Sequence, residues 1–467
     1  MSNIPHVVIL GGGFGGLAAA NEIRNTLDSS KVKITIIDKK DWFMVGYAKL
    51  WIMNGTRTFE NSIGSLNELP KKQINFIKDE IIEINPKNNF VKTKSENISF
   101  DFLIIAMGAV LAPEKIPGLT ENGFNLYDHN QLDEIHHKLN KIESGKIAIV
   151  IMGMPYKCPP APFEASLLVD SMLRKRGIRD SVQIDFYSPA PITLPAAGPE
   201  VSKQILDLVN SEKITFHNSQ KIKHVESKKL IFENDEYSFD ILLAIPPHIA
   251  PKIIYDSNLA KAPGFIPIDR DCKTPFENIF AVGDVTSLTV IDSLVVPKAG
   301  IFAEGEGITV AKNIISKIES KETSAIFDGK GGCFLESGRD TASIIEVDMF
   351  TNSKPSTKSY TDQQKEAYLT FFLESTVISE IYQKRGPEFF RNDSSHSFIS
   401  KNLKEGELVW IGNNTKINSL EKRKHVSAEK FMNEFLKKNL KVGIPKGLQS
   451  DFKRGFKVVI GNKTLSK

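Results

Sequence analysis

The stretch HVVILGGGFGGLAAA, from His6 to Ala20, limits the fold of this chain more than any other segment. It predicts a buried strand, a glycine turn and a helix, with Gly11, Gly13 and Gly16 in the spacing G-x-G-x-x-G. In that spacing one glycine makes the tight turn, one lets the backbone approach a pyrophosphate, and one lets helix and strand pack closely. The free N–H groups and the positive end of the helix then face the phosphates.

A second strand supports this interpretation. The segment KITIIDKK ends in Asp38, 22 residues after Gly16, where an acidic side chain can accept a hydrogen bond from a ribose hydroxyl. The alternative, an ordinary glycine-rich turn between a strand and a helix, does not account for an acid at this distance. The sequence therefore predicts a dinucleotide site near the N-terminus.

Length and composition are those of a globular enzyme. The chain has 467 residues, of which 41% are apolar and 25% charged, enough for two or three domains with a sizeable core. The first strand starts too early for a signal peptide, and no apolar run approaches the ~20 residues of a membrane span. We therefore expect a cytoplasmic protein.

Cysteine content and charge distribution narrow the possibilities further. The three cysteines, Cys158, Cys272 and Cys333, are too few for a disulfide scaffold, which leaves catalytic or buried thiols. Residues 401–467 carry 16 Lys and Arg against 6 acids, while the whole chain has a net charge of only +4. The last segment is thus a basic tail of unknown role.

The order of the remaining elements predicts an α/β protein. Residues 74–100 have the alternation of short hairpin strands, and 100–109 (FDFLIIAMGA) read as a buried strand. A helix is expected over 128–143, then a strand over 147–152. A further buried strand, 240–251, mirrors 100–109. The pattern predicts two Rossmann-like domains followed by a C-terminal α+β region.

These elements give a domain division. The segment TPFENIFAVGD returns the chain to the first domain, so residues 1–112 and 252–325 form that dinucleotide-binding domain. Residues 113–251 form the second, and 326–400 a C-terminal region that faces an interface or a membrane.

The turn after the strand at 147–152 departs from a nucleotide-binding turn. It reads GMPYKCPP, and prolines lack the N–H groups that a pyrophosphate requires. In place of glycines it offers Cys158 at the entrance to a helix expected from about Phe163, with Lys157 beside it and Glu164 six residues on. The cation and the helix end both favour a thiolate. The alternative is a buried structural cysteine.

Two later segments carry further candidate residues. The strand ending in Gly283 and Asp284 places a carboxylate beside a bound cofactor. The segment VVPKAG predicts a helix that begins near Pro297, with its amides and Lys298 available to the electron-rich edge of a ring. Cys333 follows in KGGCFLES.

Taken in order, GGGFGG, Asp38, IIAMGA, IPPH, TPFENIFAVGD and VPKAG resemble the two-dinucleotide-domain, FAD-dependent pyridine nucleotide-disulfide oxidoreductase superfamily. Within it, YKCPPAPFE and GGCF resemble the sulfide:quinone oxidoreductases and the flavoprotein subunit of flavocytochrome c sulfide dehydrogenase. The resemblance covers about residues 5–350.

The resemblance implies an FAD site and a redox pair. It implies that Cys158 and Cys333 form the pair and that Lys298 lies near the isoalloxazine. Beside Cys158, Glu164 is the candidate proton carrier. No cysteine stands in 41–51, where some relatives attach FAD, so we expect non-covalent FAD, and we expect no metal. The expected FAD-binding residues are Gly11, Gly13, Phe14, Gly15, Gly16, Asp38, Lys39, Ala106, Gly108, Gly283, Asp284, Pro297 and Lys298.

The implied reaction is oxidation of sulfide, or of a small thiol, with transfer of electrons through FAD to a quinone. The absence of an export signal favours a quinone over an exported cytochrome as acceptor. A type II NADH:quinone oxidoreductase is the alternative enzyme, but it needs a working nicotinamide turn. A flavin-binding redox sensor without turnover is the alternative from another class. Cys272 is expected to be structural or simply exposed.

A quinone acceptor raises the question of membrane contact. Thr361 and Gln364 have capping-box spacing and open a predicted amphipathic helix that ends at Arg385. With the basic tail, this helix could hold the protein on an anionic membrane surface. The alternative is that it packs on the protein's own core or across a homo-oligomer. No feature indicates binding to nucleic acid.

Overall fold

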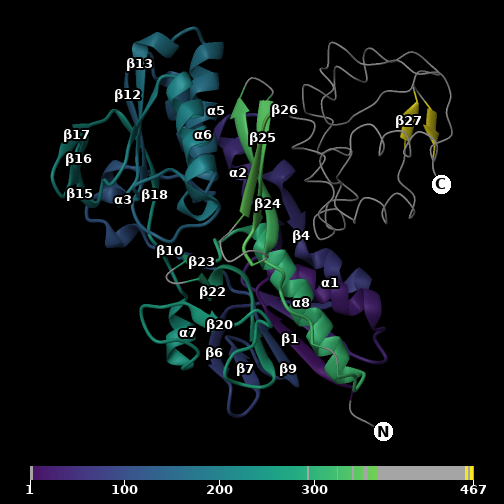
Figure 1. Cartoon of the computed structure of the whole chain (residues 1–467). Coiled ribbons are helices and arrows are strands. Elements are labelled where there is room, and N and C mark those ends of the chain that lie inside the picture. The colour runs from purple at the N-terminus through teal and green to yellow at the C-terminus, as the bar shows by residue number, and fades with distance from the viewer. Residues whose placement is uncertain are drawn as a thin grey trace. The chain divides into compact units, whose positions relative to one another are not determined.

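The computed structural model describes residues 4–291, 294–322, 324–338, 341–350, 356–364, 458–460 and 463–465 (Figure 1). The chain divides into two compact units. The first comprises Met1–Leu335 with Ile345–Ser359, and the second comprises Glu336–Ile344 with Tyr360–Lys467. All elements described below up to α8 belong to the first unit.

The first domain is built on a five-stranded parallel sheet in the order β21-β9-β1-β2-β5. The apolar runs of these strands are buried on both faces, as is typical of parallel sheets. The predicted return of the chain to this sheet is correct, because β21 pairs with β9. The strands are β1 (His6–Leu10), β2 (Lys33–Asp38), β5 (Asn75–Lys78), β9 (Phe102–Ile105) and β21 (Ile279–Ala281).

Smaller elements surround this sheet. The predicted hairpins are present as the antiparallel sheet β6-β7-β8, and β3 pairs with β4. The elements are α1 (Phe14–Thr26), β3 (Trp42–Met44), α2 (Ala48–Met53), η1 (Glu60–Ser62), β4 (Ile63–Ser65), η2 (Leu66–Lys72), β6 (Ile81–Asn85), β7 (Phe90–Thr93) and β8 (Asn97–Ser99).

The second domain repeats the plan with a parallel sheet in the order β11-β18-β12-β13-β14. An antiparallel sheet, β15-β16-β17, accompanies it. The elements are η3 (Pro113–Lys115), α3 (Leu119–Asn122), β11 (Phe124–Asn125), α4 (Leu132–Lys141), β12 (Gly145–Ile151), α5 (Ala161–Lys175), η4 (Arg179–Ser181), β13 (Val182–Tyr187), η5 (Pro195–Ala197), α6 (Gly198–Ser211), β14 (Ile214–His217), β15 (Ile222–Glu226), β16 (Lys229–Phe232), β17 (Glu236–Ser238) and β18 (Ile241–Ile245).

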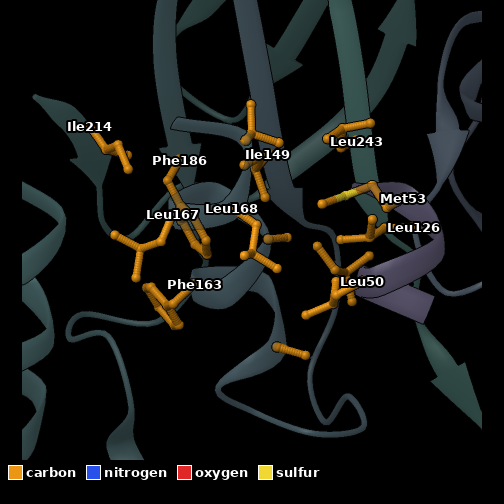
Figure 2. Packing of buried hydrophobic residues seen from close by; sticks show 14 of the residues in the cluster. Leu50, Met53, Leu126, Ile149, Phe163, Leu167, Leu168, Phe186, Ile214 and Leu243 are labelled. Carbon is orange, nitrogen blue, oxygen red and sulfur yellow. The ribbon is translucent and has the colours of Figure 1, made fainter. Parts of the chain in front are cut away.

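The core of the second domain holds side chains from both domains. Helix α5 packs on the sheet, with the rings of Phe163 and Phe186 stacked at 4.4 Å (Figure 2). Leu50 and Met53 of α2, which belong to the first domain by sequence, pack into the same cluster (Figure 2). Helix α2 therefore joins the two domains through buried apolar surface.

Two short strands connect the domains. β10 (Val110–Leu111) and β19 (His248–Ile249) pair antiparallel where the chain leaves the first domain and where it returns. Helix α8 then packs along α1, because a Cβ on Gly307 would lie only 2.3 Å from the carbonyl oxygen of Gly15. The remaining elements are α7 (Lys252–Asp256), β20 (Ile266–Ile268), η6 (Gly283–Val285), β22 (Thr286–Ile291), β23 (Leu294–Val295) and α8 (Gly300–Ile318).

The C-terminal region corrects one prediction. Strands β24 (Lys330–Gly338), β25 (Thr341–Asp348) and β26 (Ser356–Gln364) form a three-stranded sheet. The predicted helix does not begin at Thr361, because Thr361 and Gln364 lie in β26, and a capping-box match is a local signal that strand pairing overrides. The rest of that helix lies outside the described residues, as does the basic tail apart from β27 (Val458–Ile460) and β28 (Lys463–Leu465). No helix among the described residues is long and apolar enough to cross a membrane.

Replacing Arg179 should destabilise the second domain strongly. Its buried guanidinium donates to Asp170 and to the backbone carbonyls of Val182, Glu212 and Lys213. We expect Arg179→Ala to lower the free energy of unfolding by about 3–5 kcal/mol, because a buried carboxylate and three carbonyls lose their donor.

The matched control is Arg174→Ala, which removes a more exposed partner of the same Asp170. This variant should cost about 1 kcal/mol or less. Urea unfolding followed by circular dichroism measures both changes, and equal midpoints for the two variants would contradict the expectation.

Candidate active site

The turn between β1 and α1 is shaped by contacts that only glycine permits. A Cβ on Gly16 would lie 2.0 Å from the carbonyl oxygen of Gly11, and one on Gly11 would lie 2.3 Å from that of Ala106. A Cβ on Gly13 would meet nothing within 4 Å. Gly13 is the N-cap residue of α1, and among the described residues no side chain makes a capping hydrogen bond at this position. The first N–H groups of α1 therefore face open space, which fits a pyrophosphate.

The end of β2 is arranged for a ribose. Asp38 accepts hydrogen bonds from the backbone N–H groups of Gly12, at 2.8 Å, and Lys40, at 2.9 Å. Each carboxylate oxygen keeps further lone-pair capacity for a hydroxyl. Lys39 is exposed, whereas Lys40 is partly buried with its Nζ 4.3 Å from the centre of the Trp42 ring. Lys40 thus lies closer to the interior than the predicted Lys39.

The ends of β9 and β21 each carry a glycine with positive φ, and only the one after β9 is open. Gly108 has a φ of +67° and nothing within 4 Å of its Cβ position. Gly283 has a φ of +76°, and its N–H donates to the buried carboxylate of Glu306 at 2.6 Å. Burial raises the pKa of the Asp284 carboxyl and raises that of Glu306 to about 8. The predicted residues Ala106, Gly108, Gly283 and Asp284 are therefore brought to one edge of the sheet.

Helix α8 begins at Gly300, three residues after the predicted start at Pro297. Its N-cap residue Ala299 is extended, with φ −147° and ψ 147°. Among the described residues no side chain makes a capping hydrogen bond there. A Cβ on Gly300 would lie 2.7 Å from the ring of Phe14, so the starts of α8 and α1 are packed together. Two helix N-termini thus face the same region, an arrangement suited to an electron-rich ring and its phosphates.

Lys298 precedes this helix and is held by protein groups. Its Nζ donates to the carbonyls of Asp284, at 2.7 Å, and Thr286, at 3.0 Å, and lies 3.4 Å from the centre of the Phe265 ring. Burial lowers the pKa of this ammonium group to about 8. Because an ammonium group has three N–H donors, at most one remains for a ligand.

The corresponding turn of the second domain is filled by protein. A Cβ on Gly153 would lie 3.1 Å from the Cα of Pro247, in contrast to the open space at Gly13. Tyr156 and Tyr127 hold the turn, because their hydroxyls donate to the carbonyls of Pro159, at 3.2 Å, and Lys157, at 2.8 Å. The backbone at Gly153 is therefore packed against Pro247 and is not open as it is at Gly13.

Cys158 stands in this closed turn with unusual backbone geometry. Its φ of +50° lies in the left-handed region, which non-glycine residues rarely adopt. Its N–H donates to the carbonyl of Lys298 at 2.7 Å, and its own carbonyl accepts from the N–H of Ala161 at 2.9 Å. These two hydrogen bonds fix the thiol at the start of α5, and such backbone outliers cluster at functional sites.

Cys333 of β24 lies close enough to Cys158 for the two thiols to affect each other. Both are free and partly exposed. Desolvation first, then Cys333 and Glu164, raises the pKa of Cys158 well above its usual range, and desolvation followed by Glu164 raises that of Cys333 to about 12. Glu164 itself is 1% exposed in the first turn of α5. The structure therefore brings Cys158, Cys333 and Glu164 together.

The prediction that Lys157 helps to hold Cys158 as a thiolate is wrong for these free thiols. The Nζ of Lys157 donates to the carbonyl of Ala109 at 3.3 Å, and the pKa of Cys158 is raised rather than lowered. The physical reason is that burial and a neighbouring carboxylate outweigh the helix end.

The third cysteine is part of the framework. Cys272 is fully buried, and its backbone N–H and carbonyl are both bonded in the turn before β21. Among the described residues, no group of three or more His, Cys, Asp or Glu side chains could hold a metal ion.

Residues 5–154 and 173–311 match the family described as pyridine nucleotide-disulphide oxidoreductase. These residues make up more than half of the chain. The chain belongs to this family.

Several relatives within the family have sulfide-related names. The chain is 26% identical over 403 residues to the mitochondrial sulfide:quinone oxidoreductase of Dictyostelium discoideum, covering 82% of this chain and 86% of that one. It is 29% identical over 354 residues to the sulfide-quinone reductase of Aquifex aeolicus, covering 72% and 82%. A type II NADH:quinone oxidoreductase of Staphylococcus aureus is 23% identical, covering 71% and 87%.

Solved structures agree with these relatives. The sulfide:quinone oxidoreductase of Aquifex aeolicus has a TM-score of 0.72 and 26% identity, covering 84% of this chain and 95% of that chain. Residues 337–461 also match the family described as the C-terminal domain of the CCA-adding enzyme, a segment that lies mostly outside the described residues.

The family membership confirms the predicted α/β fold with Rossmann-like domains and the prediction of a flavin-dependent oxidoreductase. The open cradle at Gly13 and the two uncapped helix starts fit a flavin dinucleotide. When bound, the flavin supplies two-electron chemistry, and the strand ends of the first domain would hold it.

Sequence reasoning missed several residues at this site. Glu306 is buried on α8 between two glycines and reaches Gly283. Lys49 of α2 donates to the carbonyl of Tyr127 at 2.7 Å, and His248 packs its ring against that of Tyr127. The available signal for Glu306 and Lys49 was a charged residue inside the segments AEGEG and AKLWIM, because each interrupts an apolar stretch.

Two glycine substitutions should separate cofactor binding from folding. Gly13→Ala should fold but lose flavin, because its methyl group enters the open cradle. Gly16→Ala should fail to fold, because its methyl group would lie 2.0 Å from the carbonyl oxygen of Gly11. Flavin content after purification and thermal unfolding measure the two effects. Full flavin occupancy in Gly13→Ala would show that the cradle lies elsewhere.

Proposed function

We propose that this chain is a sulfide:quinone oxidoreductase that uses Cys158 and Cys333 as its redox pair. The observation that carries the proposal is the closed turn of the second domain, which replaces a nicotinamide site with a thiol held beside a second thiol. The sulfide-related names of the relatives support it. We also propose non-covalent FAD, since no cysteine stands in 41–51.

The proposed chemistry begins with the two cysteines joined as a disulfide or through a sulfur bridge. Hydrosulfide attacks the Sγ of Cys158, so that a new S–S bond forms there while the bond towards Cys333 breaks. From the disulfide, Cys333 leaves as a thiolate; from the sulfur bridge, it leaves as a persulfide anion that keeps the bridging sulfur. In both cases Cys158 keeps the substrate sulfur as a persulfide. The Cys158 persulfide and the released Cys333 sulfur together now hold the two electrons that are to be transferred.

A flavin held at the strand ends of the first domain would supply the acceptor for the two electrons and one proton that this sulfur pair gives up, and it would relay the electrons to a quinone. The two cysteines are then joined through the substrate sulfur, which a further hydrosulfide or thiol removes as polysulfide. Glu164, in the electrostatic neighbourhood of both sulfurs, holds or moves the proton. Lys298 and the start of α8 would supply positive charge to a ring bound beside them.

The proposal also includes the domain division, with boundaries at 112, 251 and 325. It further includes a homo-oligomeric state and attachment to the cytoplasmic face of a membrane. A surface-bound enzyme reaches quinones that partition into the bilayer. The helix expected to make that contact lies, beyond Gln364, outside the described residues.

The alternative activity is that of a type II NADH:quinone oxidoreductase, which relatives at 23% identity suggest. Anaerobic titration of the purified flavoprotein distinguishes the two. We expect sulfide to reduce the flavin stoichiometrically and NADH to reduce it far more slowly, because Pro247 closes the pyrophosphate space at Gly153. Rapid bleaching of the flavin by NADH would overturn the proposal.

Cysteine variants test the redox pair. Cys158→Ser and Cys333→Ser should each abolish flavin reduction by sulfide, because each removes one end of the S–S exchange. The double variant should be little worse than either single one, since groups that act as a unit are not additive. Stopped-flow absorbance measures the rates.

The matched control is Cys272→Ser, which changes a buried cysteine of the framework. It should leave the sulfide-dependent rate nearly intact. Appreciable sulfide turnover by Cys158→Ser would contradict the disulfide mechanism but would not affect the assignment of the flavin site.

A further inference from the structure

The peptide between Lys157 and Cys158 is held on both of its edges. Its carbonyl, on Lys157, accepts a hydrogen bond from the Tyr127 hydroxyl at 2.8 Å. Its N–H, on Cys158, donates to the Lys298 carbonyl at 2.7 Å. The C=O and N–H groups of a trans peptide point in opposite directions, so these two bonds together oppose rotation of the peptide plane. One peptide is thus fixed from two distant parts of the chain.

This peptide carries the backbone strain of the loop. Its orientation sets the φ of Cys158, which is +50°. The left-handed region is unfavourable for a residue with a Cβ, so Cys158 would turn to a negative φ if the peptide were free to rotate. Rotation would break both hydrogen bonds and would also change the direction of the Cα–Cβ bond that carries the thiol. The two bonds therefore determine where the thiol lies.

Tyr127 is itself fixed by three further contacts. Its N–H donates to Oδ1 of Asn125 at 3.0 Å, and its carbonyl accepts from Nζ of Lys49 at 2.7 Å. Its ring meets the ring of His248 edge-on at 5.6 Å, and the residue is only 8% exposed. We call Tyr127 and these three neighbours the Tyr127 cluster. A hydroxyl on a ring held in this way imposes a position on the Lys157 carbonyl rather than following it.

The Tyr127 hydroxyl is a hydrogen-bond donor at neutral pH. Desolvation first, then the charges of Cys158 and Tyr156, raises the pKa of Tyr127 well above its usual range. The Lys157 carbonyl can only accept, so the direction of the bond is fixed. The next acceptor, the Cys158 carbonyl at 3.4 Å, already accepts from the N–H of Ala161 at 2.9 Å. The single hydroxyl proton therefore belongs to the Lys157 carbonyl.

We propose that Tyr127 is a positioning residue for Cys158, because its hydroxyl holds the Lys157–Cys158 peptide in the orientation from which the two cysteines join. Without the hydroxyl, the dithiol form can relax, since Cys158 can then turn to a negative φ. The form joined to Cys333 cannot relax in this way, because a disulfide tolerates only a narrow range of Cβ positions. This inference rests on the proposed function and adds a residue that sets the stability of its redox pair.

Tyr127→Phe keeps the ring and removes only the hydroxyl. The flavin-loaded full chain is equilibrated anaerobically with reduced and oxidised glutathione, so that two protein thiols give two electrons and two protons to oxidised glutathione, which becomes two thiols. After acid quenching and alkylation, mass spectrometry counts the Cys158–Cys333 cross-link, and the flavin absorbance counts electrons that pass to the flavin. We expect the equilibrium constant for cross-linking to fall about tenfold, which raises the reduction potential of the pair by about 30 mV.

The matched control is Tyr156→Phe. It removes a hydroxyl from the same loop, but that hydroxyl donates to the Pro159 carbonyl at 3.2 Å and not to the Cys158 peptide. This variant should lower the constant by about twofold or less. Equal shifts in the two variants would overturn the inference, because each hydroxyl would then act only through the stability of the whole loop.

Two further outcomes separate this inference from the proposed function. A parent protein that forms no Cys158–Cys333 cross-link at any glutathione ratio would overturn the redox pair, and this inference with it. A parent protein that forms the cross-link, with an unchanged constant in Tyr127→Phe, would overturn this inference alone.

A second measurement needs no variant, so it holds even if Tyr127→Phe fails to fold. Crystals of the flavin-loaded parent protein in the dithiol form and in the joined form should both show the Tyr127 hydroxyl within hydrogen-bond distance of the Lys157 carbonyl, and a positive φ at Cys158. A joined form in which this peptide has rotated and lost the bond to Tyr127 would overturn the inference.

Discussion

The hydrogen bond from the N–H of Cys158 to the carbonyl of Lys298 joins the two halves of the site. It holds a second-domain loop, strained at Cys158, against the first-domain segment that leads into α8. The same lysine reaches back through its Nζ to the carbonyls of Asp284 and Thr286 at the end of β21. One short segment around Lys298 therefore links the Cys158 loop, the start of α8 and the end of β21.

The two Rossmann-like domains show how one fold is opened or closed to a nucleotide by a few atoms. At Gly13 the backbone faces empty space and an uncapped helix, and those are the conditions for phosphate binding. At Gly153 the ring of Pro247 occupies the equivalent space, and prolines precede the helix. This closely packed turn carries the Cys158 thiol, whereas the corresponding turn of the first domain is open at Gly13.

The sequence predicted what is encoded locally. The glycine turn, the position of Asp38 at the end of a strand and the buried strands follow from short-range steric rules, and the structure has them where they were predicted. That these residues bind a cofactor stays a prediction. The cluster around Tyr127 could not be predicted, because Lys49 and His248 come from distant segments that meet only after both domains fold. The thiolate expected at Cys158 failed for the same reason, since burial depends on residues far away in the chain. The helix start at Thr361 failed because a local cap signal does not exclude a strand.

Burial around the site disfavours the charged forms of both basic and acidic side chains. It lowers the pKa of Lys49 to about 7 and that of Lys298 to about 8, and it raises that of Glu306 to about 8. These groups titrate close to neutral pH, so the arrival of a charged ligand changes their protonation. A bound anion would favour the ammonium forms of Lys49 and Lys298, so that proton uptake by either group would accompany its binding.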